Sequence, residues 1–164
     1  RNFGVNLTAA LLAKKVHATL GAFWNYEGTD LRLRKRNPQI IRLEQAGVPT
    51  YDELVFVANA DKDDDRIKRF MAGLERGADD LRRNPEAGLK GLLDANKDLD
   101  PELQRAVIDV TLPLFQPPRG RPYGWQDPKE WDEFARWMRH NELLENLIDA
   151  EGAFTNEYLP GEGP

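Results

Sequence analysis

The sequence predicts an α/β fold, and a change of pattern along its 164 residues is the main reason. Residues 1–59 contain short apolar runs separated by Gly and Pro, which is typical of strands joined by turns. Residues 60–164 are rich in charge and place apolar side chains at helical spacing. The chain is 40% hydrophobic and 31% charged, which indicates a globular domain rather than a disordered segment.

The first region is expected to mix helices with strands. Apolar residues at alternate positions from Val16 to Ala22 are typical of a strand with one buried face. The unbroken apolar run 54–58 is typical of a strand buried on both faces. In chain order we expect a helix over 7–14, a strand over 16–23, a helix over 25–36 that Pro38 ends, and strands over 40–43 and 54–58.

The second region is expected to be helical, because its apolar residues recur every three or four positions. Proline follows Asn84, Asp100 and Asp127, and a polar cap before proline is a start signal for a helix. We expect helices from 61 or 63 to 81, over 85–93, over 101–114, over 128–138 and over 143–148, with a Pro- and Gly-rich loop over 116–127.

Charge and composition exclude several functions. The net charge of −5 and the pI near 5.2 argue against binding to nucleic acid, and we interpret the short basic cluster Arg32–Arg36 as a solvated helix end. These residues include no cysteine, which excludes thiol catalysis, cysteine-ligated metals and disulfides within them. No apolar run approaches the roughly 20 residues that a membrane-spanning helix needs.

One segment concentrates side chains suited to recognising a small planar molecule. Trp24, Asn25, Tyr26 and Glu27 follow the predicted strand 16–23 at its carboxyl end, where open α/β sheets bind ligands. A flat ring can stack on the aromatic side chains, and the carboxylate can accept hydrogen bonds from an exocyclic amine or a protonated ring nitrogen. The alternative is that both aromatic residues pack in a core and Glu27 occupies a first helical turn, where negative charge is favoured.

The acidic and histidine residues elsewhere carry weaker signals. The run 61–65 contains four aspartates but lacks the glycine and the closing glutamate of a calcium-binding loop, so we expect Asp61 or Asp63 to cap a helix. His17 and His140 are single histidines without a partner signal, and we assign neither one a ligand or catalytic role. The sequence thus predicts no catalytic residue, no cofactor and no metal site.

The aromatic residues of the second region have a structural interpretation. Trp131 and Phe134 share one face of the last long predicted helix, with Trp137 on the same helix, which indicates core packing rather than a second ligand platform. The loop 116–127 leaves two alternatives open for Tyr123–Trp125. These residues either pack against a core or close over a cleft, because long loops often carry function.

The segment Gly21–Gly28, which reads GAFWNYEG, also matches a known family. It resembles the cleft-lining motif of the pyrimidine-precursor family of thiamine biosynthesis, whose bacterial members are substrate-binding proteins of ABC importers. The similarity is collinear and spans nearly the whole chain. The other matching segments are 6–7, 10–12, 15–19, 47–57, 123–128, the aromatic positions of 131–138, 155–156 and 159–161.

This resemblance implies a periplasmic-binding-protein-like fold of type II, with two α/β lobes and two crossings between them. On that plan the chain is a C-terminal fragment: residues 1–48 form the end of the second lobe, and residues 49–164 form the mostly helical C-terminal part of the first. Residues 48–50 would be the returning hinge. We also expect a segment before Arg1, because Phe3–Val5 reads like a strand already under way.

The resemblance also implies a function. Family members hold their ligand in the interlobe cleft, so Trp24, Asn25, Tyr26 and Glu27 are the expected ligand-binding residues. The protein would be the substrate-binding component of an ABC importer for a thiamine pyrimidine precursor, hydroxymethylpyrimidine or formylaminopyrimidine, and not an enzyme. Its partners would be the small pyrimidine and an ABC permease, and not nucleic acid. It would be periplasmic, or extracellular and tethered to the membrane by the permease or an N-terminal anchor.

Three alternatives remain open. The eukaryotic branch of the family makes the pyrimidine, but it depends on a cysteine-rich segment that these residues lack. A second alternative is a different ligand: riboflavin, nitrate or an alkanesulfonate. Anions require Arg or helix N-termini, whereas the segment offers Glu27, which favours an amine-bearing ring. The third is a sensor or scaffold that reuses the fold without transport.

Overall fold

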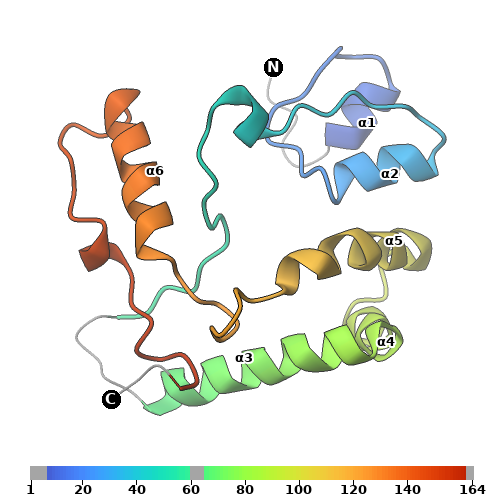
Figure 1. Cartoon of the computed structure of the whole chain (residues 1–164). Coiled ribbons are helices and arrows are strands. Elements are labelled where there is room, and N and C mark those ends of the chain that lie inside the picture. The colour runs from blue at the N-terminus through green and yellow to red at the C-terminus, as the bar shows by residue number, and fades with distance from the viewer. Residues whose placement is uncertain (1–6, 60–64, 162–164) are drawn as a thin grey trace. The chain divides into compact units, whose positions relative to one another are not determined.

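The computed structural model of the protein describes residues 7–59 and 65–161, and its regular structure within these ranges is helical (Figure 1). The chain divides into two compact units. The first comprises Arg1–Arg42 and Asn84–Leu114, and the second comprises Leu43–Arg83 and Phe115–Pro164. The boundary between lobes that was expected near residue 48 stays a prediction. The two compact units divide the chain at other residues, after Arg42, Arg83 and Leu114.

The described part of the first unit contains four helices: α1 (Leu7–Leu12), α2 (Glu27–Leu33), α4 (Pro85–Ala95) and α5 (Pro101–Thr111). Helix α2 packs on both α1 and α5, and α5 packs on α4. The buried apolar side chains come from three of these helices and are small or medium in size: Ala10, Leu31 and Leu89.

Local signals in the sequence begin α4 and α5 where expected. The side chain of Asn84 accepts a hydrogen bond from the backbone N–H of Ala87, and Pro85 occupies the first turn. Asp100 accepts from the N–H groups of both residues that follow Pro101. Each cap satisfies N–H groups that have no partner inside the helix, so both predicted starts are confirmed.

The second unit contains the long helix α3 (Asp65–Arg83), helix α6 (Pro128–His140), and the 3₁₀ turns η1 (Leu43–Ala46) and η3 (Glu151–Ala153). The 3₁₀ turn η2 (Leu112–Phe115) lies where the two units join along the chain. The expected cap at Asp61 or Asp63 lies outside the described residues. Asp127 accepts from the N–H of Lys129, which confirms the predicted start of α6.

Aromatic side chains hold α6 to the rest of the second unit. Phe134 stacks on Tyr51 with ring centroids 4.5 Å apart and on Trp137 at 5.8 Å. Trp131 stacks on Phe154 at 5.2 Å. These contacts confirm that the aromatic residues of this helix pack against neighbouring segments.

Three helices end in the same way, and none of them uses glycine. Lys14, Lys35 and Glu142 have φ values of 54°, 56° and 60°, and each follows the end of a helix. The N–H of the next residue donates back into the last turn, to the carbonyls of Ala10, Leu31 and Met138. This arrangement is a Schellman motif, which stops the helix. It explains why the helices predicted over 7–14 and 25–36 end earlier in the structure, at Leu12 and Leu33.

The Schellman motif at Glu142 also corrects the helix predicted over 143–148. The left-handed residue turns the backbone away from the axis of α6, and residues 143–148 form bends rather than a helix. Leu143, Leu147 and Ile148 remain exposed, so no apolar face forms from them.

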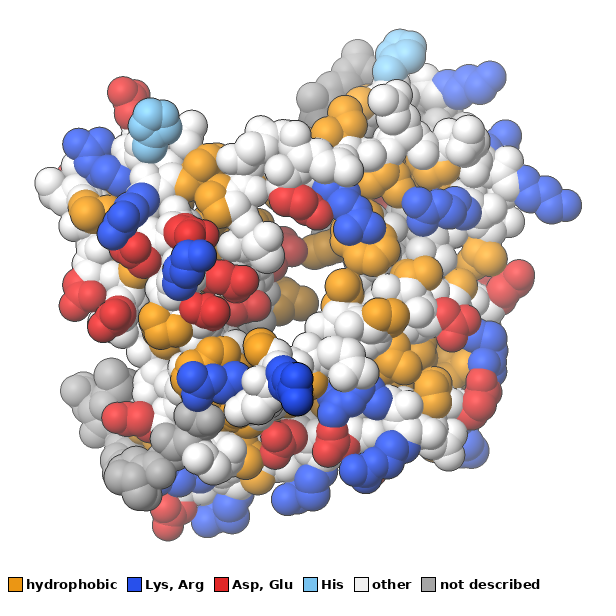
Figure 2. All heavy atoms as spheres, in the orientation of Figure 1, with side chains coloured by type: hydrophobic (Ala, Val, Ile, Leu, Met, Phe, Trp, Pro, Cys, Tyr) orange, Lys and Arg blue, Asp and Glu red, His pale blue; other side chains and the backbone are white. Residues whose placement is uncertain are grey.

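The strands predicted over 16–23, 40–43 and 54–58 are wrong for this structure, because none of them forms in the described residues. A strand is stable only when a neighbouring strand accepts and donates its backbone hydrogen bonds. These runs have no such neighbour here. Their apolar side chains are consequently exposed, as the fractions for Leu20 (87%), Leu54 (89%) and Val57 (91%) show. Figure 2 shows apolar side chains spread over the surface among the charged ones.

Candidate ligand site

The predicted ligand-binding residues lie in one turn and the start of α2. Glu27 begins the helix, and its Oε2 accepts a hydrogen bond of 2.8 Å from the backbone N–H of Phe23. The carbonyl of Phe23 accepts from the N–H groups of Tyr26 and Gly28, at 3.2 Å each. The side chain of Glu27 therefore closes the turn that carries the other predicted residues, Trp24, Asn25 and Tyr26.

Helix α5 fixes two of these residues from outside the segment. Asn25 Nδ2 donates to Thr111 Oγ1 at 2.9 Å, and Gln104 Nε2 donates to Tyr26 Oη at 3.4 Å. Asn25 is half-buried, Gln104 is buried, and Tyr26 is more open to solvent. The turn and α5 thus share a group of polar contacts inside the first unit.

A cation covers one face of the predicted stacking residue Trp24. The guanidinium carbon of Arg42 lies 4.2 Å from the centroid of the Trp24 ring, within cation–π range. The sequence interpretation foresaw neither this contact nor the two bonds from α5. Arg42 is 18 residues from Trp24 along the chain, and no local spacing links the two.

The residues that sequence reasoning missed are therefore Gln104, Thr111 and Arg42. One signal was available for two of them. Gln104 and Thr111 are seven residues apart, which places them on one face of a helix whose predicted inner face was apolar. Two polar residues on such a face predict a polar partner.

The two histidines to which the sequence analysis assigned no role, His17 and His140, are both exposed. Within residues 7–59 and 65–161, no group of three or more potential ligand side chains is arranged to hold a metal ion. In those same ranges no helix combines the length and the hydropathy needed to cross a bilayer.

The loop 116–127 packs within the second unit. The guanidinium carbon of Arg121 lies 3.8 Å from the Trp125 ring centroid. A side chain at Gly124 would contact Leu159 and Met71, so the loop backbone passes close to both. Burial raises the pKa of Tyr123, although the charge of Arg82 lowers it in part. Whether this loop also closes over a cleft stays a prediction.

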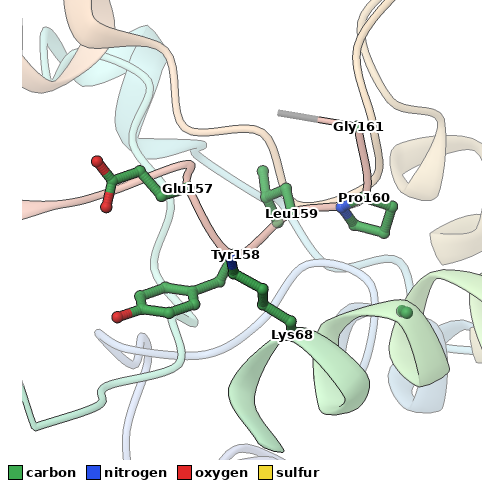
Figure 3. A pocket seen from close by; sticks show the side chains of 7 residues that line it. Lys68, Glu157, Tyr158, Leu159, Pro160 and Gly161 are labelled. Carbon is green, nitrogen blue, oxygen red and sulfur yellow. The ribbon is translucent and has the colours of Figure 1, made fainter. Parts of the chain in front are cut away.

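The second unit also contains a hollow of about 360 Å³, formed where the C-terminal segment crosses α3 (Figure 3). Lys68 and Ala72 line it from the helix, and residues 157–161 line it from the segment. Glu157 is exposed, while Lys68 and Tyr158 are half-buried. None of the four predicted ligand-binding residues lines this hollow.

Comparison with known proteins finds relatives whose names describe either the binding of a pyrimidine or a step of biosynthesis. The chain is 28% identical over 160 residues to a formylaminopyrimidine-binding protein of Halalkalibacterium halodurans, covering 93% of this chain and 48% of that protein. It is 31% identical over 150 residues to a Haemophilus influenzae protein whose name assigns it to thiamine biosynthesis, covering 90% and 46%. A 4-amino-5-hydroxymethyl-2-methylpyrimidine phosphate synthase of Legionella pneumophila is 24% identical over 162 residues, covering 96% and 49%.

Two further facts follow from these comparisons. The chain spans about half the length of the curated relatives it matches. The model of the NMT1/THI5-like family matches residues 1–88, which include the whole segment Trp24–Glu27 and more than half of the chain. The protein therefore belongs to the NMT1/THI5-like family.

Proposed function

We propose that this protein binds an amine-bearing pyrimidine, a precursor of thiamine, as the substrate-binding component of an ABC importer. Trp24, Asn25, Tyr26 and Glu27 are its ligand-binding residues in this proposal. Membership of the NMT1/THI5-like family supports the class of ligand, together with the name of the formylaminopyrimidine-binding relative. The geometry of Glu27 is the observation that carries the choice of residues.

The carboxylate of Glu27 is fixed and still has capacity to accept hydrogen bonds. One oxygen accepts from the N–H of Phe23, and no described residue donates to the other. A carboxylate offers about four lone-pair positions, so a single backbone bond leaves room for an amine or a protonated ring nitrogen. A hydrogen bond from a charged or amine donor to a carboxylate is among the stronger kinds.

The aromatic residues suit the ring of the same ligand. Tyr26 is 38% exposed, and Trp24 is half-buried with Arg42 over its ring. A planar ring can stack on an exposed aromatic face with offset geometry. In the whole protein, ligand binding would favour a closed form that an ABC permease recognises, in the periplasm or at the outer face of the membrane.

The runner-up is an enzyme that makes the pyrimidine, and the synthase among the relatives favours it. Growth complementation distinguishes the two in a strain that cannot make the pyrimidine. A synthase restores growth without added pyrimidine. A binding component restores growth only when its permease and ATPase are present and a pyrimidine is supplied in the medium.

Calorimetry on the intact protein tests the proposed site. We expect wild-type protein to bind formylaminopyrimidine, and Glu27→Ala to weaken binding by about 10- to 100-fold, or about 1.4–3 kcal/mol. Glu27→Gln should weaken it too, because an amide that keeps the Phe23 bond presents a donor where the carboxylate accepts. Asp30→Asn is the matched control, since it removes a negative charge from the same helix. The carboxylate of Asp30 pairs with Arg34 at 2.7 Å and is not one of the proposed ligand-binding groups.

The control separates site chemistry from charge. Unchanged affinity in both Glu27 variants removes that carboxylate from the site. An equal loss in Asp30→Asn would assign the effect to net charge instead. Tighter binding of riboflavin than of any pyrimidine would replace the proposed ligand class.

A further inference from the structure

One face of α5 carries two polar side chains, and each contacts the candidate ligand segment. Gln104 and Thr111 are seven residues apart, so they lie two helical turns from each other on the same face. Thr111 accepts from Asn25 at 2.9 Å, and Gln104 donates to Tyr26 at 3.4 Å. Both contacts join α5 to the turn before α2, within the same compact unit.

Polar side chains are buried where α5 and α2 meet. Gln104 is 6% exposed and Thr29, on the facing helix α2, is 5% exposed. Thr29 Oγ1 has no hydrogen-bond partner among the described residues. Burying a polar group costs free energy unless a hydrogen bond compensates for it. Gln104 offsets this cost with its bond to Tyr26 Oη, so the polar face of α5 is coupled to the turn before α2.

We propose that Thr111 is a positioning residue that sets the donor and acceptor pattern of the ligand site, an inference that rests on the proposed function. A carboxamide can face a ligand with either its NH₂ group or its oxygen. In this structure the NH₂ group of Asn25 donates to Thr111 Oγ1, and no described residue donates to Asn25 Oδ1. The Thr111 bond thus leaves the oxygen as the free end of the side chain.

An acceptor at Asn25 would act together with the carboxylate of Glu27, which also accepts. Two acceptors only two residues apart select a ligand that presents donors, and they oppose one that presents a carbonyl oxygen at the same place. Thr111 would in this way favour an aminopyrimidine over its oxo counterpart. Gln104 plays a parallel part for Tyr26, because its amide restrains the phenol group of the ring.

The test compares two ligands that differ in one group. The first is 4-amino-5-hydroxymethyl-2-methylpyrimidine, and the second is its 4-oxo analogue, in which a carbonyl replaces the amine. We measure the ratio of their dissociation constants by calorimetry on the intact protein, for wild type, Thr111→Val and Thr111→Ser. Valine has the shape of threonine without the hydroxyl, whereas serine keeps the hydroxyl.

The positioning role predicts that Thr111→Val lowers the preference for the amino ligand by roughly five- to tenfold, the effect of about one hydrogen bond. Thr111→Ser, which keeps the hydroxyl group, should retain the wild-type preference for the amino ligand. A purely structural role would weaken both ligands equally and leave the ratio unchanged, which overturns the inference. If the valine variant does not fold, Thr111→Ala provides the same comparison.

The outcomes also separate this inference from the proposed function. Wild-type protein that binds neither ligand refutes the proposed function. Wild-type protein that prefers the amino ligand, with the same preference in Thr111→Val, keeps the proposed function and refutes the role of Thr111. In the variant Asn25→Ala, the serine and valine substitutions at residue 111 should no longer differ in this ratio.

Discussion

A methyl group on Gly28 would lie 2.7 Å from Cδ1 of Ile40, a separation that real carbon atoms do not adopt. Gly28 is buried in the first turn of α2, directly after Glu27. The end of the Ile40 side chain therefore lies where a methyl group at position 28 would be, and it would have to shift to make room. This contact links the candidate ligand segment to the chain that follows α2.

The first prediction concerns that contact. Gly28→Ala should be less stable than the gain in helix propensity alone would make it, because Cδ1 at the end of the Ile40 side chain has to shift away from the added methyl group. Ile40→Val removes the clashing Cδ1 atom, so the double variant should be more stable than Gly28→Ala alone. Chemical denaturation measures each free energy of unfolding.

Gly91→Ala is the matched control in the same unit. Gly91 lies in α4, and nothing lies within 4 Å of an added methyl group there. Alanine should stabilise this helix by about 0.5–1 kcal/mol. A Gly28→Ala variant as stable as Gly91→Ala would contradict the packing of Ile40 against α2.

The second prediction concerns the end of α2. Lys35 has a φ of 56°, a left-handed conformation that costs a residue with a side chain about 1 kcal/mol and costs glycine much less. Lys35→Gly should therefore raise the midpoint of thermal unfolding. The neighbouring change Arg36→Gly should lower it, since glycine there brings only added chain entropy. Opposite signs for the two substitutions are the expected result, and equal signs would argue against the Schellman motif at this helix end.

The third prediction concerns a pair of hydrogen bonds that tie the C-terminal segment to the loop before α6. The backbone N–H of Gln126 donates to Asn156 Oδ1, and Asn156 Nδ2 donates to the carbonyl of Gln126, both at 2.9 Å. Asn156→Asp keeps the oxygen that accepts from the N–H of Gln126. It replaces the NH₂ group with a second oxygen, which cannot donate to the carbonyl of Gln126. It should destabilise the protein by about 1 kcal/mol, the lower end of the cost of an unsatisfied polar group, because both residues are only half-buried.

The rate of hydrogen exchange at the Gln126 amide measures this contact directly. The amide of Gln126 should lose protection in Asn156→Ala and retain more of it in Asn156→Asp, which still offers an acceptor. Thr155→Ala is a suitable control, because its hydroxyl accepts only from the exposed N–H of Glu157. Protection at Gln126 that does not depend on residue 156 would contradict the arrangement.

The fourth prediction concerns pH. Burial raises the pKa of Glu130, and the negative charges of Asp52, Asp127 and Glu133 raise it further, while Lys129 lowers it. The folded protein therefore binds this proton more tightly than the unfolded chain does. The contribution of Glu130 to the free energy of unfolding should rise as the pH falls through the raised pKa, and level off below the ordinary pKa. Because the burial is only partial and most of the Glu130 side chain stays in contact with solvent, the gain should stay below about 1 kcal/mol.

Asp52→Asn tests the electrostatic part of this shift. Removing the charge of Asp52 should lower the pKa of Glu130 toward its ordinary value, which a carboxyl-resolved NMR titration measures. Asp80→Asn, at an exposed position near Arg83, should leave that pKa unchanged. A pKa of Glu130 that is the same in both variants would exclude Asp52 as a cause.

The sequence alone determined where three helices begin. Asn84, Asp100 and Asp127 each stand before proline, and each side chain accepts from the N–H groups just beyond it. These bonds join residues two or three positions apart, so their geometry depends on the local backbone and hardly on the rest of the protein. The motif around Glu27 could be recognised in the sequence for a similar reason, because its residues are consecutive.

Tertiary structure decided what those local signals could not. The bond from Gln104 to Tyr26 joins residues 78 positions apart, and the bond from Asn25 to Thr111 joins residues 86 apart. Only the packing of α2 on α5 brings them together. The apolar runs at 16–23 and 54–58 show the converse, since a strand pattern forms a strand only where another strand completes its hydrogen bonds. The sequence by itself determined the helix starts and the family motif, and only the folded chain decided which distant side chains meet.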